Sequence, residues 1–264
     1  MIKICHFITK DIEEDSHIRN GKKCWHRVNG NLVFNDTTLI LTAVTELIKI
    51  YFEKTPHYRS VVHAFSKTVL NNCTGQNLYT ELSRTKKYTT YDYYNLIVKY
   101  KTLPLMVKLP FTLGLILSNV KDNDSYEETD RICFEMAKLL QTQIDFIDCY
   151  GHQSTIKSNG IETAEKSLCK IAKGKLTWLA AKAMESCTPA QSTIFEKCYG
   201  SEDSANIETI KRLYEHLNLQ ESFTKFKDEQ YDTILEMSRK LSPLLSPEPF
   251  INFASNVREI QNCF

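Results

Sequence analysis

The sequence has 264 residues, of which 42% are hydrophobic, enough for one domain with a full core or for two small ones. Its 33 basic and 32 acidic residues are balanced, so nothing in the composition points to a nucleic-acid or membrane-surface partner. Glycine, with 8 residues, and proline are scarce, which favours long helices joined by short turns over many strands.

Apolar residues recur at helical spacing along most of the chain. A first helix is predicted over 37–54, after the typical capping residues Asn35 and Asp36. Its apolar stripe consists of Leu39, Ala43, Leu47 and Ile50. Further helices are predicted over 58–70, 90–102, 127–149, 189–200, 204–217, 221–241 and 247–260, with a long polar loop over 152–167. The pattern predicts an all-α fold with a single domain, 1–264.

Local signals refine this outline. Thr188 and Pro189 have the residue types of an N-cap and a first-turn proline. The apolar run 103–117 is interrupted by prolines and by Lys108, so no membrane span is predicted. Nine cysteines are scattered without a CxxC pair, which is typical of reduced thiols, and we expect a cytoplasmic protein.

Two acidic segments are candidates for metal chemistry. On a helix, Asp11 and Asp15 would project from one face, and paired carboxylates one turn apart can hold Mg²⁺ ions that bridge to a diphosphate. Asp145 and Asp148 interrupt an otherwise apolar helix in register with Gln141, and buried charges need partners. Spacing alone leaves open that the first segment is a solvated surface and that the second is a helix end returning to solvent.

Lysines could bind the diphosphate itself. The candidates are Lys99, Lys101, Lys166, Lys170, Lys173 and Lys175. Ammonium groups neutralise phosphate charge, although lysines on helices more often lie at the surface.

Taken in order, five segments resemble those of farnesyl diphosphate synthase and its relatives, the trans-isoprenyl diphosphate synthase family. They are FITKDIEED followed by RNG and CW (7–25), GQ (75–76), IVKYKT (97–102), QTQIDFIDCYG (141–151) and IAKGKLTW (171–178). The resemblance implies an isoprenoid synthase-type helical bundle, here expected to lack its first helices. It also implies a homodimer.

The chemistry implied is Mg²⁺-assisted ionisation of an allylic prenyl diphosphate, either geranyl or farnesyl diphosphate. The implied metal ligands are Asp11, Asp15, Asp145 and Asp148, and the implied catalytic residues are Asp11, Asp15, Asp145 and Lys101. The implied diphosphate-binding residues are Arg19, Lys101, Thr102, Gln141, Lys166 and Lys175. The implied residues of the prenyl pocket are His6, Phe7 and Gln76, with His6 and Phe7 at its floor.

Several positions depart from the family pattern. Acidic residues of the family are replaced by Ile144, Tyr79 and Lys170. Asp11 and Asp15 match the outer acids of the first motif if one residue is deleted before Arg19, which is the alignment we prefer. Without that deletion, Lys10 and Glu14 stand there instead.

The side of the site that would bind isopentenyl diphosphate departs further. Asn20 stands where the family has the second of two arginines. We also expect the family's basic C-terminal tail and its N-terminal helices to be missing. We therefore favour a terpene-synthase-like enzyme that ionises the allylic diphosphate without elongating it. The alternatives are a farnesyl or geranyl diphosphate synthase (a prenyltransferase) and a catalytically inactive homologue that acts as a partner subunit.

Overall fold

The computed structural model describes residues 1–85, 90–150 and 170–260. The N-terminal elements are α1 (Ile2–Glu13), β1 (Ile18–Arg19), β2 (Lys22–Lys23), α2 (Trp25–Asn29), η1 (Gly30–Leu32), α3 (Val33–Phe52) and α4 (Tyr58–Arg84). The central ones are α5 (Tyr91–Ile97), η2 (Val98–Lys108), α6 (Leu109–Leu117) and α7 (Asn123–Tyr150). The last are α10 (Trp178–Ser186), α11 (Pro189–Cys198), α12 (Ser204–His216), α13 (Leu219–Arg239) and α14 (Glu248–Glu259). The predicted all-α fold is confirmed for these residues, which add only one two-stranded hairpin.

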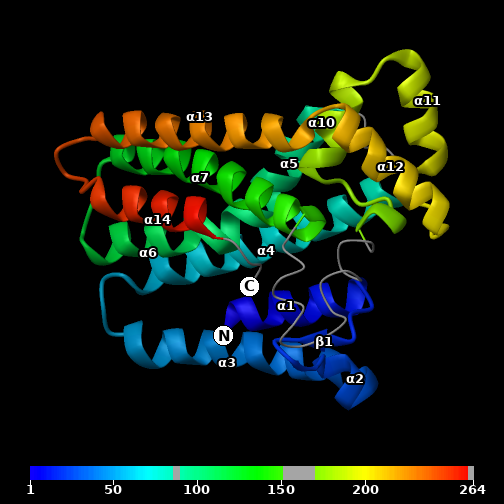
Figure 1. Ribbon diagram of the computed structural model, residues 1–264. Coiled ribbons are helices and arrows are strands. Elements are labelled where there is room, and N and C mark those ends of the chain that lie inside the picture. The colour runs from blue at the N-terminus through cyan, green and yellow to red at the C-terminus, as the bar shows by residue number, and fades with distance from the viewer. Residues whose placement is uncertain (86–89, 151–169, 261–264) are drawn as a thin grey trace.

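The helices form a layered bundle (Figure 1). In the view of Figure 1, α13 and α7 run along the top, α14 and α6 lie beside them, and α4 crosses beneath. The pair α1 and α3 forms the lowest layer. α7 is the central helix, with Ile132, Cys133, Met136 and Ala137 almost fully buried. The amphipathic run predicted over 127–149 is confirmed by this helix.

The other predicted helices agree with the structure to different degrees. α11, α12, α13 and α14 fall within a few residues of prediction, and Thr188 and Gln191 form a capping box at α11. The helix predicted over 58–70 continues to Arg84. The polar loop predicted over 152–167 lies outside the described residues.

A π-helix carries the chain through Pro104. The helix predicted over 90–102 does not end there but continues through η2 and α6 to Leu117. In η2 the N–H of Leu109 bonds the carbonyl of Pro104, five residues earlier, and this wider turn accommodates a residue that has no N–H to donate. Pro110 lies in the first turn of α6, where proline is tolerated.

Gly75 allows α4 and η2 to touch. A Cβ at this position would lie 2.3 Å from the carbonyl carbon of Tyr100 and 2.4 Å from the backbone nitrogen of Lys101. One turn earlier, the side-chain amide of Asn72 donates to the carbonyl of Lys101 at 2.8 Å. The glycine therefore fixes where Lys101 sits relative to α4.

The lowest layer departs from the sequence prediction. Leu39 and Ile50, two residues of the predicted apolar stripe of α3, are 62% and 70% exposed. Among the longer helices, α3 packs only against α1 and α4. One apolar face of α3 is therefore exposed in a single copy of the described chain. Asp36, predicted to cap this helix, instead accepts hydrogen bonds from Trp25 and Asn29 and ties α2 to α3.

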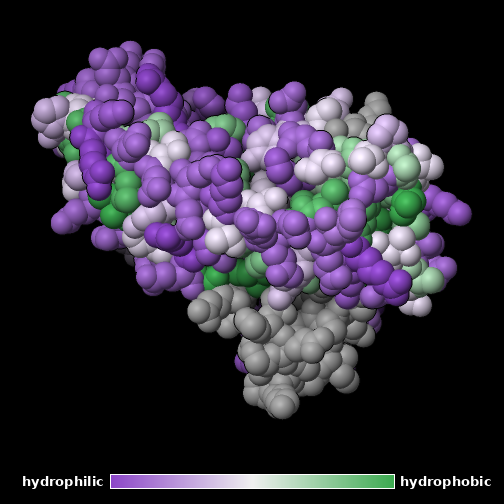
Figure 2. Space-filling model, turned by 45° about the horizontal axis from the view of Figure 1, so that its top comes forward, coloured by the Kyte–Doolittle hydropathy of each residue, from purple (hydrophilic) through white to green (hydrophobic). Residues whose placement is uncertain are grey.

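The face seen when the top of Figure 1 is turned forward is mainly hydrophilic, with small separate apolar areas (Figure 2).

By length and composition, the helical run Tyr91–Leu117 would suffice to cross a membrane. In the structure this run contacts both α4 and α7, and 39% of its apolar window is buried inside the protein.

Candidate active site

The first acidic segment divides at the end of α1. Asp11 is 3% exposed, and both of its oxygens accept from the guanidinium of Arg19, at 2.6 and 2.7 Å. Asp15 lies beyond the helix end with a φ of 49°, and it pairs with Arg27 at the surface. The expectation that Asp11 and Asp15 share a helix face is therefore wrong, because α1 ends at Glu13.

The hairpin β1–β2 holds Arg19 in place. Its turn consists of Asn20 and Gly21, with φ values of 52° and 72°. Two positive φ angles in a two-residue hairpin turn favour the pair Asn-Gly. The asparagine that replaces a family arginine thus has a local structural role in this turn.

The second acidic segment lies near the end of α7 and is neutralised from inside the protein. Asp145 is 2% exposed, and its Oδ2 accepts from the backbone N–H of Trp178 at 2.9 Å, at the start of α10. Its Oδ1 accepts from Gln141 at 2.9 Å and from Lys170 Nζ at 3.2 Å. Lys170 also forms an ion pair with Asp148. Burial would lower the pKa of Lys170, but these two carboxylates outweigh it and raise that pKa well above its usual range.

Lys170 opens a short segment, 170–175, that we call the lysine turn. The N–H groups of Lys175 and Gly174 bond the carbonyls of Lys170 and Ile171, and Gly174 has a φ of 57°, as in a Schellman motif. From this turn Lys173 donates to the carbonyl of Glu14, and Lys175 pairs with Glu13 at 3.1 Å. The lysine turn thus connects the ends of α1 and α7.

Glu13 is a residue that the sequence analysis missed. It accepts from Thr80 at 2.7 Å as well as from Lys175. Four acids in five residues at a helix end were a visible signal, but the spacing could not show which acid faces inward.

Lys101 lies between the two acidic segments. Its ammonium group is 3.4 Å from the ring centroid of Tyr79, and that of Lys175 is 5.0 Å from the same ring. Tyr79, at a position acidic in the family, therefore contacts two cations through its π face. Desolvation lowers the pKa of Lys101 to about 7, with Glu13 opposing the shift.

The residues predicted to line the prenyl pocket lie next to Lys101. Burial, with the charges of Lys101 and Lys10, lowers the pKa of His6 to about 4, so this imidazole is neutral at pH 7. The Phe7 ring stacks under the guanidinium of Arg19, at 4.9 Å. The buried side-chain amide of Gln76 has no hydrogen-bond partner among the described residues.

Thr102 and Gln141, which the sequence predicts to bind the diphosphate, form hydrogen bonds that support Asp145 instead. The Thr102 hydroxyl donates to Gln141 at 2.5 Å, and Gln141 in turn donates to Asp145. This relay fixes the Asp145 carboxylate from the side opposite Trp178. Lys166, also predicted to bind the diphosphate, lies outside the described residues.

These contacts do not fit the Mg²⁺ cluster that was expected. Mg²⁺ needs carboxylate oxygens at about 2.0–2.1 Å in near-octahedral geometry. Both oxygens of Asp11 and of Asp145 already accept from strong donors, and Asp15 turns away to Arg27. In the part of the chain that the structure describes, no three carboxylate, imidazole or thiol groups are placed to hold one metal ion.

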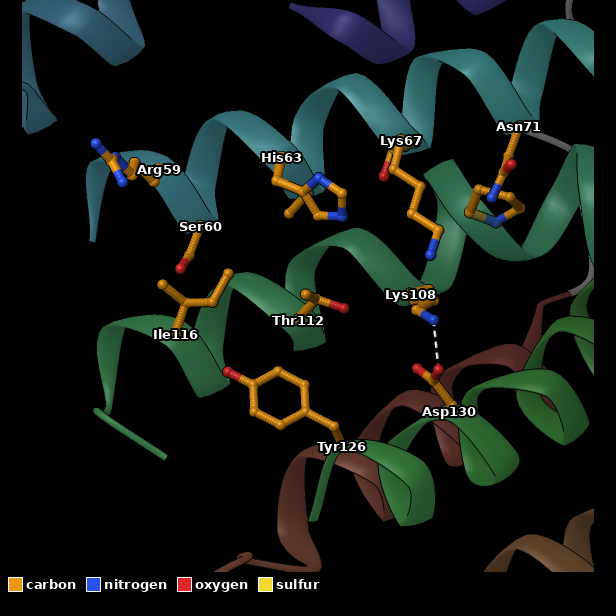
Figure 3. A pocket seen from close by; sticks show the side chains of 13 residues that line it. Arg59, Ser60, His63, Lys67, Asn71, Lys108, Thr112, Ile116, Tyr126 and Asp130 are labelled. Carbon is orange, nitrogen blue, oxygen red and sulfur yellow. Dashed lines mark hydrogen bonds and ion pairs between the residues drawn. The ribbon is translucent and has the colours of Figure 1, made fainter. Parts of the chain in front are cut away.

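A cavity of about 450 Å³ lies at the other end of the same helices (Figure 3). Arg59, His63 and Lys67 from α4 line one side of it, and the ion pair of Lys108 with Asp130 lies on the other. None of the site residues predicted from the sequence lines this cavity. It is therefore separate from the charged cluster around Lys101.

Comparison with known proteins identifies the family. The family model described as polyprenyl synthetase matches residues 1–217. The chain belongs to the polyprenyl synthetase family. It is 27% identical to a farnesyl diphosphate synthase of Dictyostelium discoideum over 95% of this chain and 66% of that protein. It is 30% identical to the farnesyl pyrophosphate synthase of Zea mays, over 86% of this chain and 64% of that protein.

A solved structure shares the polyprenyl synthetase fold. The T. brucei farnesyl diphosphate synthase in complex with homorisedronate superposes with a TM-score of 0.81 and 23% identity. The alignment covers 100% of this chain and 76% of the other. The isoprenoid synthase-type bundle predicted from the sequence is confirmed, and the chain spans about two thirds of the length of the curated relatives it matches.

Proposed function

We propose that this chain binds an allylic prenyl diphosphate at the cluster around Lys101 and acts as a prenyltransferase of isoprenoid metabolism. The observation that carries the proposal is the excess of unpaired cations at this point. Among the described residues, neither Lys101 nor Lys173 has a carboxylate within 4.0 Å, although both lie next to the ends of α1 and α7. Ammonium groups that make no direct ion pair can bind an anion.

The reaction needs charge stabilisation at the leaving group. The allylic C–O bond breaks with both electrons on the diphosphate oxygen, and under this proposal Lys101, Lys173 and Lys175 stabilise the charge that develops there. In a prenyltransferase, the allylic carbon then bonds to the alkene of isopentenyl diphosphate, and a proton is lost to the released diphosphate. The neutral imidazole of His6 and the ring of Phe7 offer the prenyl chain apolar contacts.

The relatives named above support this choice over the terpene-synthase-like enzyme favoured by the sequence. That second candidate keeps one observation in its favour. Asn20, in place of an arginine, is exposed in the β1–β2 turn and supplies no charge for a second diphosphate. Under that proposal the allylic cation would rearrange or lose a proton without any acceptor.

A product assay separates the two. The protein is incubated with geranyl or farnesyl diphosphate, with and without isopentenyl diphosphate, and products are analysed by gas chromatography–mass spectrometry. Longer prenyl diphosphates that need isopentenyl diphosphate support the prenyltransferase, whereas volatile hydrocarbons or alcohols formed without it support the second candidate. No product from protein that unfolds cooperatively would contradict both and favour the inactive partner subunit.

Two variants show whether product formation uses this site. Lys101→Met removes the ammonium group while keeping most of the side-chain volume, and it should abolish product. Lys225→Met changes a lysine of α13 whose side chain is 77% exposed, and it should leave product formation unchanged.

A further inference from the structure

Lys170 occupies the place of a cation that joins two carboxylates. Its ammonium group contacts both Asp145 and Asp148, and its side chain is only 13% exposed. In the family pattern this position is acidic, and the carboxylates of both motifs would share metal ions. Here the bridging positive charge is part of the chain.

The contacts around Lys170 oppose its replacement by a metal ion. Asp145 accepts three hydrogen bonds, from Gln141, Trp178 and Lys170, so a metal ion could bind it only by displacing one of them. Removing Lys170 from this position would separate an ammonium group from the two carboxylates that it pairs with in a mostly buried environment, which is costly.

The first acidic segment is closed in a similar way. Arg19 binds both oxygens of Asp11 in the bidentate geometry that suits a guanidinium and a carboxylate. Glu13 is held by Lys175 and Thr80. The two segments are connected to each other through the lysine turn and not through carboxylates facing a common ion.

We propose that the lysine turn replaces the divalent metal ions, so that this site binds the diphosphate group of its ligand without Mg²⁺. The inference rests on the proposed function, since it takes the ligand to be a diphosphate. Lys170 pairs with Asp145 and Asp148 and offsets one of their two negative charges, whereas Lys101 and Lys173 have no carboxylate within 4.0 Å among the described residues and are available to the ligand. A lysine ammonium group has three N–H donors, so Lys173 keeps two after its bond to the Glu14 carbonyl.

The test is isothermal titration calorimetry of the full chain with inorganic pyrophosphate, once in excess EDTA and once with Mg²⁺. The inference predicts dissociation constants that agree within about threefold. Binding that is more than tenfold tighter with Mg²⁺ would overturn the inference and leave the proposed function standing. No binding under either condition would overturn both.

Substitution of Lys170 supplies a second, independent readout. Lys170→Asp adds a carboxylate beside Asp145 and Asp148, and pyrophosphate binding should become at least tenfold tighter with Mg²⁺ than with EDTA. Lys170→Arg keeps the bridging charge and should stay insensitive to EDTA. If Lys170→Asp does not fold, the arginine variant still decides: a strong dependence on Mg²⁺ in Lys170→Arg or in the unaltered chain would contradict the inference.

Discussion

The ends of α1 and α7 are both acidic, and cations hold both of them in different ways. At α1, two arginines take one carboxylate each, and the pair of Asp15 with Arg27 lies largely in solvent. At α7, a single lysine pairs with two carboxylates whose side chains are 2% and 11% exposed. Burial makes the second arrangement hard to open, whereas an exposed ion pair exchanges readily with water. The difference indicates that Lys170 and its two carboxylates form a fixed framework, whereas the outer pair at the end of α1, Asp15 with Arg27, is the more adaptable one.

The largest expected loss of stability follows from breaking the ion pairs at the end of α7, compared with breaking the exposed pair at the end of α1. Lys170→Ala leaves Asp145 and Asp148 buried without their cation and should lower the free energy of unfolding by about 3–5 kcal/mol. Arg27→Ala removes only an exposed ion pair and should lower the free energy of unfolding much less. Urea denaturation at pH 7 measures both. Equal losses in the two variants would show that the contrast between the two ends is wrong.

The contact between α4 and η2 comes next. Gly75→Ala places a methyl group against the backbone of Tyr100 and Lys101, and it should cost about 1–3 kcal/mol and weaken pyrophosphate binding by displacing Lys101. Gly114→Ala is the matched control, because nothing lies within 4 Å of its Cβ and alanine stabilises a helix by about 0.5–1 kcal/mol. Denaturation and calorimetry report the two effects. Unchanged pyrophosphate affinity in Gly75→Ala would show that Gly75 does not position Lys101.

Titration of Lys101 gives a smaller effect that depends on pH. Because its pKa is about 7, the ammonium form dominates below that pH and is lost as pH rises through it. Pyrophosphate affinity should therefore fall above pH 7, by at most about tenfold per pH unit. The charged groups that act on Lys101 are Glu13, Glu14 and Lys10 from α1 and Lys170 from the lysine turn.

Lys101→Arg is the control for this titration, since arginine stays charged and the ligand titrates equally in both proteins. The difference in affinity between the two proteins should grow from pH 7 to pH 9. A difference that stays constant with pH would show that Lys101 does not titrate in this range.

The smallest effect on stability is expected on α3. Leu39→Lys together with Ile50→Lys changes side chains that are exposed in a single copy, so each should alter the free energy of unfolding by no more than about 0.5 kcal/mol. If a second copy covers this face, light scattering should show a dimer for the unaltered chain and a monomer for the variant. Thr45→Lys, on the same helix, controls for added charge. A monomeric unaltered chain would contradict the homodimer.

Much of the fold could be predicted from the sequence, because helical periodicity and caps act locally. α7 and α11 are examples, the first through its apolar stripe and the second through Thr188. The orientation of α3 could not be predicted. An apolar stripe shows which face of a helix favours burial, but it does not show whether residues of the same copy bury it. The continuation of the helix through Pro104 could not be predicted either, because it depends on the π-helical turn of η2 and on the contact at Gly75.

The candidate site was predictable in its members more than in its contacts. Asp11 pairs with Arg19, Lys101 and Lys175 lie over the same ring of Tyr79, and Asp145 pairs with Lys170 of the lysine turn. That Asp15 turns outward depends on α1 ending two residues earlier, and spacing does not give a helix end to that accuracy. Lys170 was recognised as a replaced acid, but its bridge between Asp145 and Asp148 needed the geometry of the lysine turn.

The most direct test of the central claim is a crystal structure of the full chain soaked with pyrophosphate and Mn²⁺, with data collected at a wavelength where manganese scatters anomalously. The account predicts pyrophosphate beside Lys101 and Lys173, Lys170 still paired with Asp145 and Asp148, and no anomalous peak at either carboxylate. A manganese peak at a coordinating distance of about 2.1 Å from Asp145, with Lys170 displaced, would contradict it.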